Sequence, residues 1–152
     1  MASGNALDLL FVLIAFFIQL VLIKHFALRR WAFATAMRFG VLVYGLSIPA
    51  VIVSALLLAG GKPWYLWVPG ILYLAWATYG YSVEYILHLN WRTPIRWSVL
   101  VPYVVSYLAA LMFYWWPLAT ISRPLWYGYA MLFVVSTLLN ILSHRGQVAI
   151  GG

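Results

Sequence analysis

The chain has 152 residues, of which 66% are hydrophobic and 7% are charged, whereas a soluble domain has roughly 45–50% apolar and about 25% charged residues. This composition excludes a soluble globular domain and predicts a chain embedded in a lipid bilayer. A net charge of +7 would suggest nucleic acid as the partner of a soluble protein. Here we expect no nucleic acid, because the basic residues suit membrane topology and contacts with anionic lipid headgroups.

Five apolar stretches are long enough to form membrane spans, since a spanning helix needs about 20 apolar residues. They leave only short connections, so we expect residues 1–152 to form a single transmembrane domain. The predicted fold class is all-α, a polytopic membrane bundle of five transmembrane helices. In chain order the predicted spans are about 6–26, 39–59, 64–89, 94–116 and 123–143.

Proline and capping residues mark several of the predicted helix boundaries. Pro63 follows a glycine-rich turn and is well placed to start the third span. Thr93 followed by Pro94 predicts the start of the fourth span, and Ser122 that of the fifth. Prolines within spans predict kinks that free backbone carbonyls, and they are Pro49, Pro69 and Pro102.

Basic residues are distributed unevenly between the two sides of the predicted bundle. One side holds Lys62 and Arg123. The other side holds seven, which are Lys24, Arg29, Arg30, Arg38, Arg92, Arg96 and Arg145. The positive-inside rule makes the side with seven basic residues cytoplasmic. We therefore expect an external N-terminus and a cytoplasmic C-terminus, in a cytoplasmic membrane of the bacterial type.

Large aromatic residues gather at the predicted outer end of the third, fourth and fifth spans. An interfacial belt explains them, because indole and phenol rings favour the headgroup region. The alternative is a pocket of roughly 300 Å³ or more for an apolar ligand, in which Trp67 and Trp115 or Trp116 share the lining. The residues concerned are Trp64, Tyr65, Trp67, Tyr114, Trp115, Trp116, Trp126 and Tyr127.

In size, span number and richness in tryptophan and tyrosine, the chain resembles the tryptophan-rich sensory (translocator) proteins. The local similarity covers residues 62–73, a proline-containing start to an aromatic helix. This stretch follows the second predicted span, whereas in that family it follows the first. Members of the family bind porphyrins and sterols, and no residue role is carried over to this chain.

Glu84 is the only acidic residue within a predicted span. An ionisable residue at membrane depth indicates a functional site by default. Glu84 lies about five residues, or roughly 8 Å, before the end of the third span, and His88 at i+4 is expected on the same helix face. The carboxylate either pairs with Arg92, Arg96 or another inner-side cation, or it binds a proton or a ligand.

The three histidines, His25, His88 and His144, lie at the inner ends of the first, third and fifth predicted spans. Together with Glu84 they could supply three imidazoles and a carboxylate to a zinc ion, and two of them could be axial ligands of a haem. The alternative is structural, because histidine suits the negative C-terminal end of a helix.

The chain contains no nucleophile elbow, phosphate-binding glycine loop or catalytic acidic pair. The first hypothesis is therefore a non-enzymatic membrane protein that binds a lipophilic small molecule, or a small subunit of a homo-oligomer or larger membrane complex. The second is a proton-coupled small transporter or channel that uses Glu84. The third is a lipid-active enzyme, or a metal- or haem-dependent one, that uses the three histidines.

Overall fold

The computed structural model describes the backbone of residues 2–91 and 94–148, and the side chains of residues 6–91 and 94–143. Within these ranges the chain is helical apart from short connections and has no strand, which confirms the all-α prediction. The helices are α1 (Ala2–Trp31), α2 (Phe33–Gly45), α3 (Ser47–Ala59), α4 (Trp64–Tyr81), the π-helical turn η1 (Ser82–Ile86), α5 (Trp97–Ile121) and α6 (Arg123–Val148).

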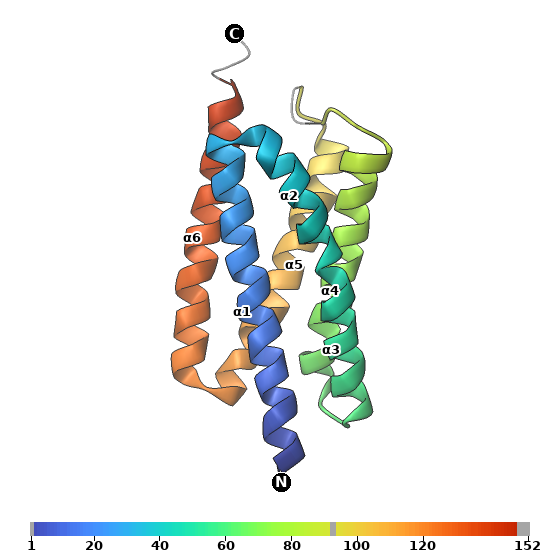
Figure 1. The fold of residues 1–152 in the computed structure, drawn as a ribbon, viewed down its shortest axis with the longest axis vertical. Coiled ribbons are helices and arrows are strands. Elements are labelled where there is room, and N and C mark those ends of the chain that lie inside the picture. The colour runs from blue at the N-terminus through green and yellow to red at the C-terminus, as the bar shows by residue number, and fades with distance from the viewer. Residues whose placement is uncertain (1, 92–93, 149–152) are drawn as a thin grey trace.

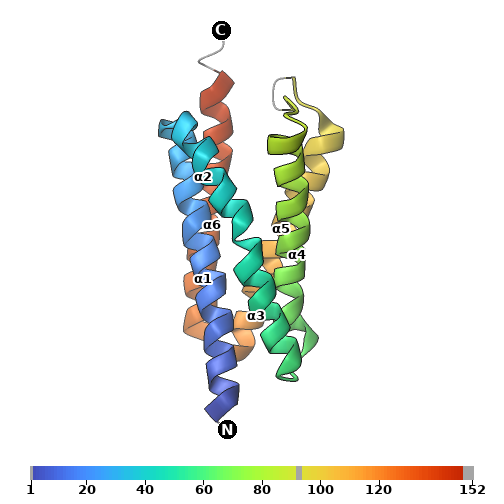
Figure 2. The same ribbon diagram turned by 45° about the vertical axis from the view of Figure 1, so that its right-hand side comes forward.

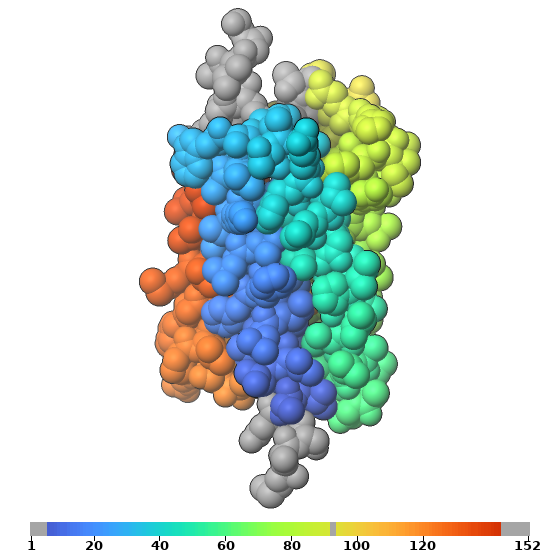
Figure 3. All heavy atoms as spheres, in the orientation of Figure 1, coloured from blue at the N-terminus to red at the C-terminus, as the bar shows by residue number. Residues whose placement is uncertain are grey.

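The helices form an elongated bundle in which neighbours in the chain are mostly neighbours in space (Figure 1). Helix α1 packs between α6 and the α2–α3 segment, and on this face its side chains fill the space between them (Figure 3). Helix α4 packs between α3 and α5, and α5 packs against α6, which closes the ring. The two ends of the chain lie at opposite ends of the bundle.

Within the described part of the chain, four helical segments are long and apolar enough to cross a membrane, which is compatible with an integral membrane protein. They are Ala6–Trp31, Phe33–Ala59, Trp97–Ile121 and Arg123–Ser143. Helix α4 is not among them, because its three tryptophans and four tyrosines make it less hydrophobic than the other segments. The five-span count therefore stays a prediction.

The α2–α3 segment is interrupted at Leu46, three residues before Pro49. Proline has no N–H group, and its ring clashes with the carbonyl four residues earlier, which here belongs to Gly45. The flanking hydrogen bonds persist, from Leu46 N to the Leu42 carbonyl at 3.0 Å and from Ala50 N to the Leu46 carbonyl at 3.1 Å. The kink predicted at Pro49 stays a prediction, and the Gly45 carbonyl has no N–H donor at position 49, because that residue is proline.

Helices α4 and α5 run without interruption through Pro69 and Pro102. Helix α2 begins at Phe33, six residues before the predicted start of the second span near residue 39. The predicted start of the fourth helix at Pro94 was wrong. The backbone of Arg96 is extended, so α5 begins only at Trp97, and Thr93 lies outside the described residues.

The third predicted span, 64–89, ends three residues early, at Ile86. The final turn is π-helical, and Leu87 N donates to the Ser82 carbonyl at 2.8 Å. His88 then takes a positive φ of 47°, which is incompatible with a continuing helix. The expectation that His88 shares a helical face with Glu84 was therefore wrong.

Two glycines allow α4 to approach the α2–α3 segment closely. A Cβ atom at Gly70 would lie 2.5 Å from the Ala50 carbonyl oxygen, so only glycine fits there without a shift of the α3 backbone. At Gly80 a Cβ atom would lie 2.6 Å from the ring of Tyr44. Both contacts fix the position of α4, and the second also fixes the Tyr44 ring.

Candidate functional site

The only two acidic residues of the chain, Asp8 and Glu84, each form an ion pair with a basic residue. Asp8 of α1 pairs with Lys62 in the α3–α4 turn, near the N-terminal end of the bundle. Glu84 of η1 pairs with Arg29 near the end of α1, toward the opposite end. These two regions are the candidate sites.

Glu84 lies within a buried cluster that we call the Glu84 cluster, comprising Arg29, Tyr44, Glu84 and Tyr103. Arg29 Nη2 lies 3.5 Å from Glu84 Oε1, and the two side chains are only 3% and 6% exposed. The prediction of a basic partner on the side with seven basic residues is thereby met by Arg29. Arg96 is exposed, and Arg92 lies outside the described residues.

The second carboxylate oxygen of Glu84 is satisfied by a different helix. The Tyr44 hydroxyl donates to Glu84 Oε2 at 2.8 Å, and it lies 3.3 Å from the hydroxyl of Tyr103 on α5. The cluster thus links α1, α2, η1 and α5. Single π-helical turns such as η1 occur frequently at functional sites.

Aromatic rings cover the Glu84 cluster on its inner side. The Trp76 ring lies 5.4 Å from that of Tyr44 and 5.8 Å from that of Tyr103, measured between centroids. Trp91, in the connection before α5, is 1% exposed and lies 5.2 Å from the Tyr103 ring. Because the Arg29 and Glu84 side chains are themselves almost completely buried, their charges interact in a lower dielectric than water.

The two histidines whose side chains are described have different environments. His25 is buried and stacks on Phe39, with ring centroids 6.3 Å apart, whereas His88 is exposed. The side chain of His144 lies outside the described residues. Among the side chains that are described, no three His, Asp or Glu groups could hold a metal ion together. A zinc or haem site that includes His144 stays a prediction.

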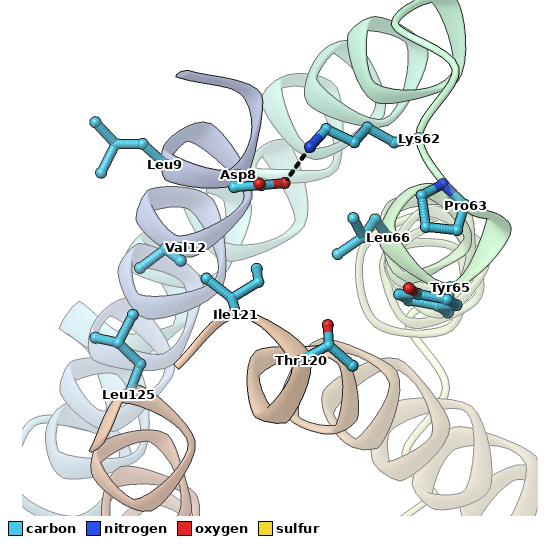
Figure 4. Close-up of a pocket in the computed structure, with 10 residues that line it drawn as sticks. All are labelled: Asp8, Leu9, Val12, Lys62, Pro63, Tyr65, Leu66, Thr120, Ile121 and Leu125. Atoms are coloured by element: carbon cyan, nitrogen blue, oxygen red, sulfur yellow. Dashed lines mark hydrogen bonds and ion pairs between the residues drawn. The ribbon is translucent and has the colours of Figure 1, made fainter. Parts of the chain in front are cut away.

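A cavity of about 600 Å³ opens at the N-terminal end of the bundle, and we call it the end cavity. It lies between α1, the start of α4 and the α5–α6 turn, and Asp8 and Lys62 meet across it with Nζ 2.6 Å from Oδ1 (Figure 4). Beneath this pair, Val12, Leu66 and Ile121 point toward the same space. Its lining comprises Asp8, Leu9, Val12, Lys62, Pro63, Tyr65, Leu66, Thr120, Ile121 and Leu125.

The predicted aromatic ligand residues lie near this end of the bundle but do not line the end cavity. Trp115 stacks on Trp126 of α6 at 5.0 Å, and its Nε1 donates to the Trp126 carbonyl at 3.0 Å. Trp116, the next residue of α5, contacts Trp64 of α4 instead, at 5.9 Å. Trp115 and Trp116 thus face different neighbours. The predicted ligand cavity shared by Trp67 and one of these two residues stays a prediction.

Sequence patterns did not single out the end cavity, since no motif brings Asp8 to Lys62. The small number of charged residues near this end of the bundle is the signal that could have indicated the pair. Asp8 is the only acid near the start of the chain, and Lys62 is the only basic residue in the α3–α4 turn. No protein family model, curated protein or solved structure matches the chain. The function is therefore argued from the two candidate regions themselves.

Proposed function

We propose that this chain is an integral membrane protein that binds a lipophilic small molecule with a polar head in the end cavity. The main support is that the end cavity combines about 600 Å³ of space and a largely apolar wall with the adjacent carboxylate of Asp8 and ammonium group of Lys62. Ligand pockets usually measure about 300–1,000 Å³ and combine apolar walls with a few polar groups.

The ion pair in the end cavity suits a ligand head that forms hydrogen bonds or carries charge. Asp8 and Lys62 side chains are 31% and 18% exposed, so either group can be reached from outside the bundle. Partly exposed pairs of this kind contribute only about 0–1 kcal/mol, so exchanging one partner for a ligand group costs little. Val12, Leu66 and Ile121 would contact the apolar body of the ligand.

Substitution of Val12 by phenylalanine tests this function, because it narrows the end cavity from within α1. The protein is purified in nanodiscs, and the small molecules that co-purify are identified by mass spectrometry. Val12→Phe should lower the amount of the bound molecule about tenfold. Leu13→Phe is the matched control, because Leu13 is 55% exposed on the same helix and does not line the cavity. Equal recovery from both variants would contradict the proposal.

The proposal includes five spans, with the N-terminus outside and the C-terminus inside. Helix α4 supports the fifth span because it lies lengthwise between α3 and α5. On α5, exposed Trp97 and Trp116 are separated by about 28 Å of helix, close to the roughly 30 Å hydrocarbon thickness. Reporter fusions at Gly61 and Ala119 should read external, and fusions at Trp91 and Gly152 cytoplasmic. A cytoplasmic N-terminus would refute this topology.

A role as a subunit of a homo-oligomer is a second candidate, and α6 favours it. Only 11% of the apolar segment of α6 is buried, compared with 39% for α1. Five of its exposed apolar residues are spaced alternately by four and three, as in a helix–helix seam. They are Tyr127, Met131, Val134, Leu138 and Ile141.

Single-cysteine variants test this candidate without background, since the chain has no cysteine. Oxidation of Leu138→Cys in membranes should give a disulfide-linked dimer. Val105→Cys, on an equally exposed position of α5, should stay monomeric. Equal cross-linking of both variants would indicate random collision and would remove the support for an oligomer through α6.

A further inference from the structure

A second hollow, which we call the lateral groove, lies between the α2–α3 break and the α4–η1 segment. Its volume is about 390 Å³. Five of its nine lining residues carry a hydroxyl group. None of the nine is acidic or basic, so the lining carries no charge at neutral pH. The lining comprises Val41, Tyr44, Gly45, Ser47, Ala77, Thr78, Tyr81, Ser82 and Ile86.

The lateral groove also contains a backbone acceptor without its helical donor. In a regular helix the Gly45 carbonyl would accept a hydrogen bond from residue 49, but residue 49 is proline. The N–H groups of Leu46 and Ala50 bond to the carbonyls of Leu42 and Leu46. Gly45 itself lines the groove and is exposed, so its backbone is accessible to a bound molecule.

Position along the bundle indicates where such a molecule would come from. Gly45 lies about 18 Å from the start of α2 and about 21 Å from the end of α3, which is midway along the candidate span Phe33–Ala59. Val41, Tyr81 and Ile86, at the rim of the lateral groove, are exposed on the surface of the bundle. In the membrane protein proposed above this surface faces lipid. The hydrocarbon core supplies no water to satisfy a free carbonyl.

We propose that the lateral groove binds a neutral lipid alcohol whose hydroxyl donates to the Gly45 carbonyl. The apolar body of the molecule would lie along Val41, Ala77 and Ile86, and its edge would contact the Tyr44 ring. A charged headgroup has no counter-charge in the lining, because Glu84 and Arg29 pair with each other behind Tyr44. The inference rests on the proposed membrane location but not on the ligand of the end cavity.

The test uses a photoactivatable diacylglycerol, which has one free hydroxyl, with the full chain in nanodiscs. Two probes with the same acyl chains serve as comparisons: the methyl ether of that hydroxyl, and a phosphatidylglycerol. The diacylglycerol should label the lateral groove about tenfold more strongly than either comparison probe. Equal labelling by all three probes would show that bulk lipid alone fills the groove, which would overturn the proposal.

Two substitutions separate the shape of the lateral groove from its hydrogen bond. A Cβ atom at Gly45 would meet nothing within 4 Å, so the position has room for a side chain, and Gly45→Val should narrow the groove and abolish selective labelling. Ile52→Phe, on the lipid-exposed face of α3, is the matched control and should label like the wild type. Pro49→Ala restores the helical donor to Gly45, so it should reduce the advantage of the diacylglycerol over its methyl ether.

Gly45→Val labelling at the wild-type level would refute the location of the site. An unchanged preference for the free hydroxyl in Pro49→Ala would refute the role of the Gly45 carbonyl. Neither result affects the molecules that co-purify in the end cavity, so the failure of this inference is distinguishable from the failure of the proposed function.

Discussion

The two ion pairs of this chain have the same chemistry and opposite surroundings. Lys62 and Asp8 approach to 2.6 Å with side chains 18% and 31% exposed, whereas Arg29 and Glu84 are 3.5 Å apart and almost completely buried. The shorter pair is the less consequential one. Water or a ligand can replace a lost partner in the end cavity, whereas the burial of Arg29 and Glu84 leaves water little access to the Glu84 cluster. Burial therefore decides the importance of each pair more than distance does.

The largest effect is expected from Glu84→Gln, which leaves the buried guanidinium of Arg29 without its counter-charge. Loss of one partner of a buried pair costs about 3–5 kcal/mol. Thermal unfolding in detergent should show this as a large fall in melting temperature. The double variant Glu84→Gln with Arg29→Met should recover part of the loss, because it removes the isolated charge. An unchanged melting temperature for Glu84→Gln would refute a structural role for the pair.

A smaller effect is expected from Tyr44→Phe, which removes the hydroxyl that donates to Glu84 Oε2. A hydrogen bond to a charged group contributes about 1.5–3 kcal/mol, and a neutral one about 0.5–1.5 kcal/mol. Tyr79→Phe is the matched control, because the Tyr79 hydroxyl donates to the neutral carbonyl of Val99 at 3.2 Å. Unfolding in detergent should rank Tyr44→Phe as the more destabilising change. The reverse order would show that the charge of Glu84 adds nothing to this bond.

The smallest effect is expected from Asp8→Asn. This pair is partly exposed, so its loss should cost less than about 1 kcal/mol. At about 1 M salt, where charges are screened beyond roughly 3 Å, the difference between Asp8→Asn and the wild type should shrink further. The deficit of Glu84→Gln should persist at the same salt concentration. Equal salt dependence of the two variants would remove the distinction between the pairs.

Much of the helical architecture follows from the lengths of the apolar stretches. They predict the bounds of α1, α5 and α6 to within five residues. The scarcity of acids drew attention to Glu84. Its partner Arg29 lies 55 positions earlier in the chain, and no local pattern connects them.

The orientation of aromatic rings is the part that the sequence predicted least well. In a soluble helix, polar residues mark the outer face, but in a membrane a tryptophan is equally acceptable toward lipid and toward protein. Trp115 and Trp116 differ by about 100° around α5, and nothing in their sequence indicates which one faces α6. The end cavity lies at the same end of the bundle as the aromatic cluster. Its lining includes Tyr65 but none of the tryptophans that were predicted to bind a ligand.

The close contact at Gly70 has a mechanical consequence. Helices α4 and α5 diverge from α1, α2 and α6 toward the C-terminal end of the bundle (Figure 2), while Gly70 holds α4 against the α3 backbone nearer the other end. A second close contact, between Gly80 and the Tyr44 ring, lies about 15 Å further along α4. Together the two contacts resist a tilt of α4 away from the α2–α3 segment, so they hold η1 and its Glu84 carboxylate at a constant distance from Tyr44.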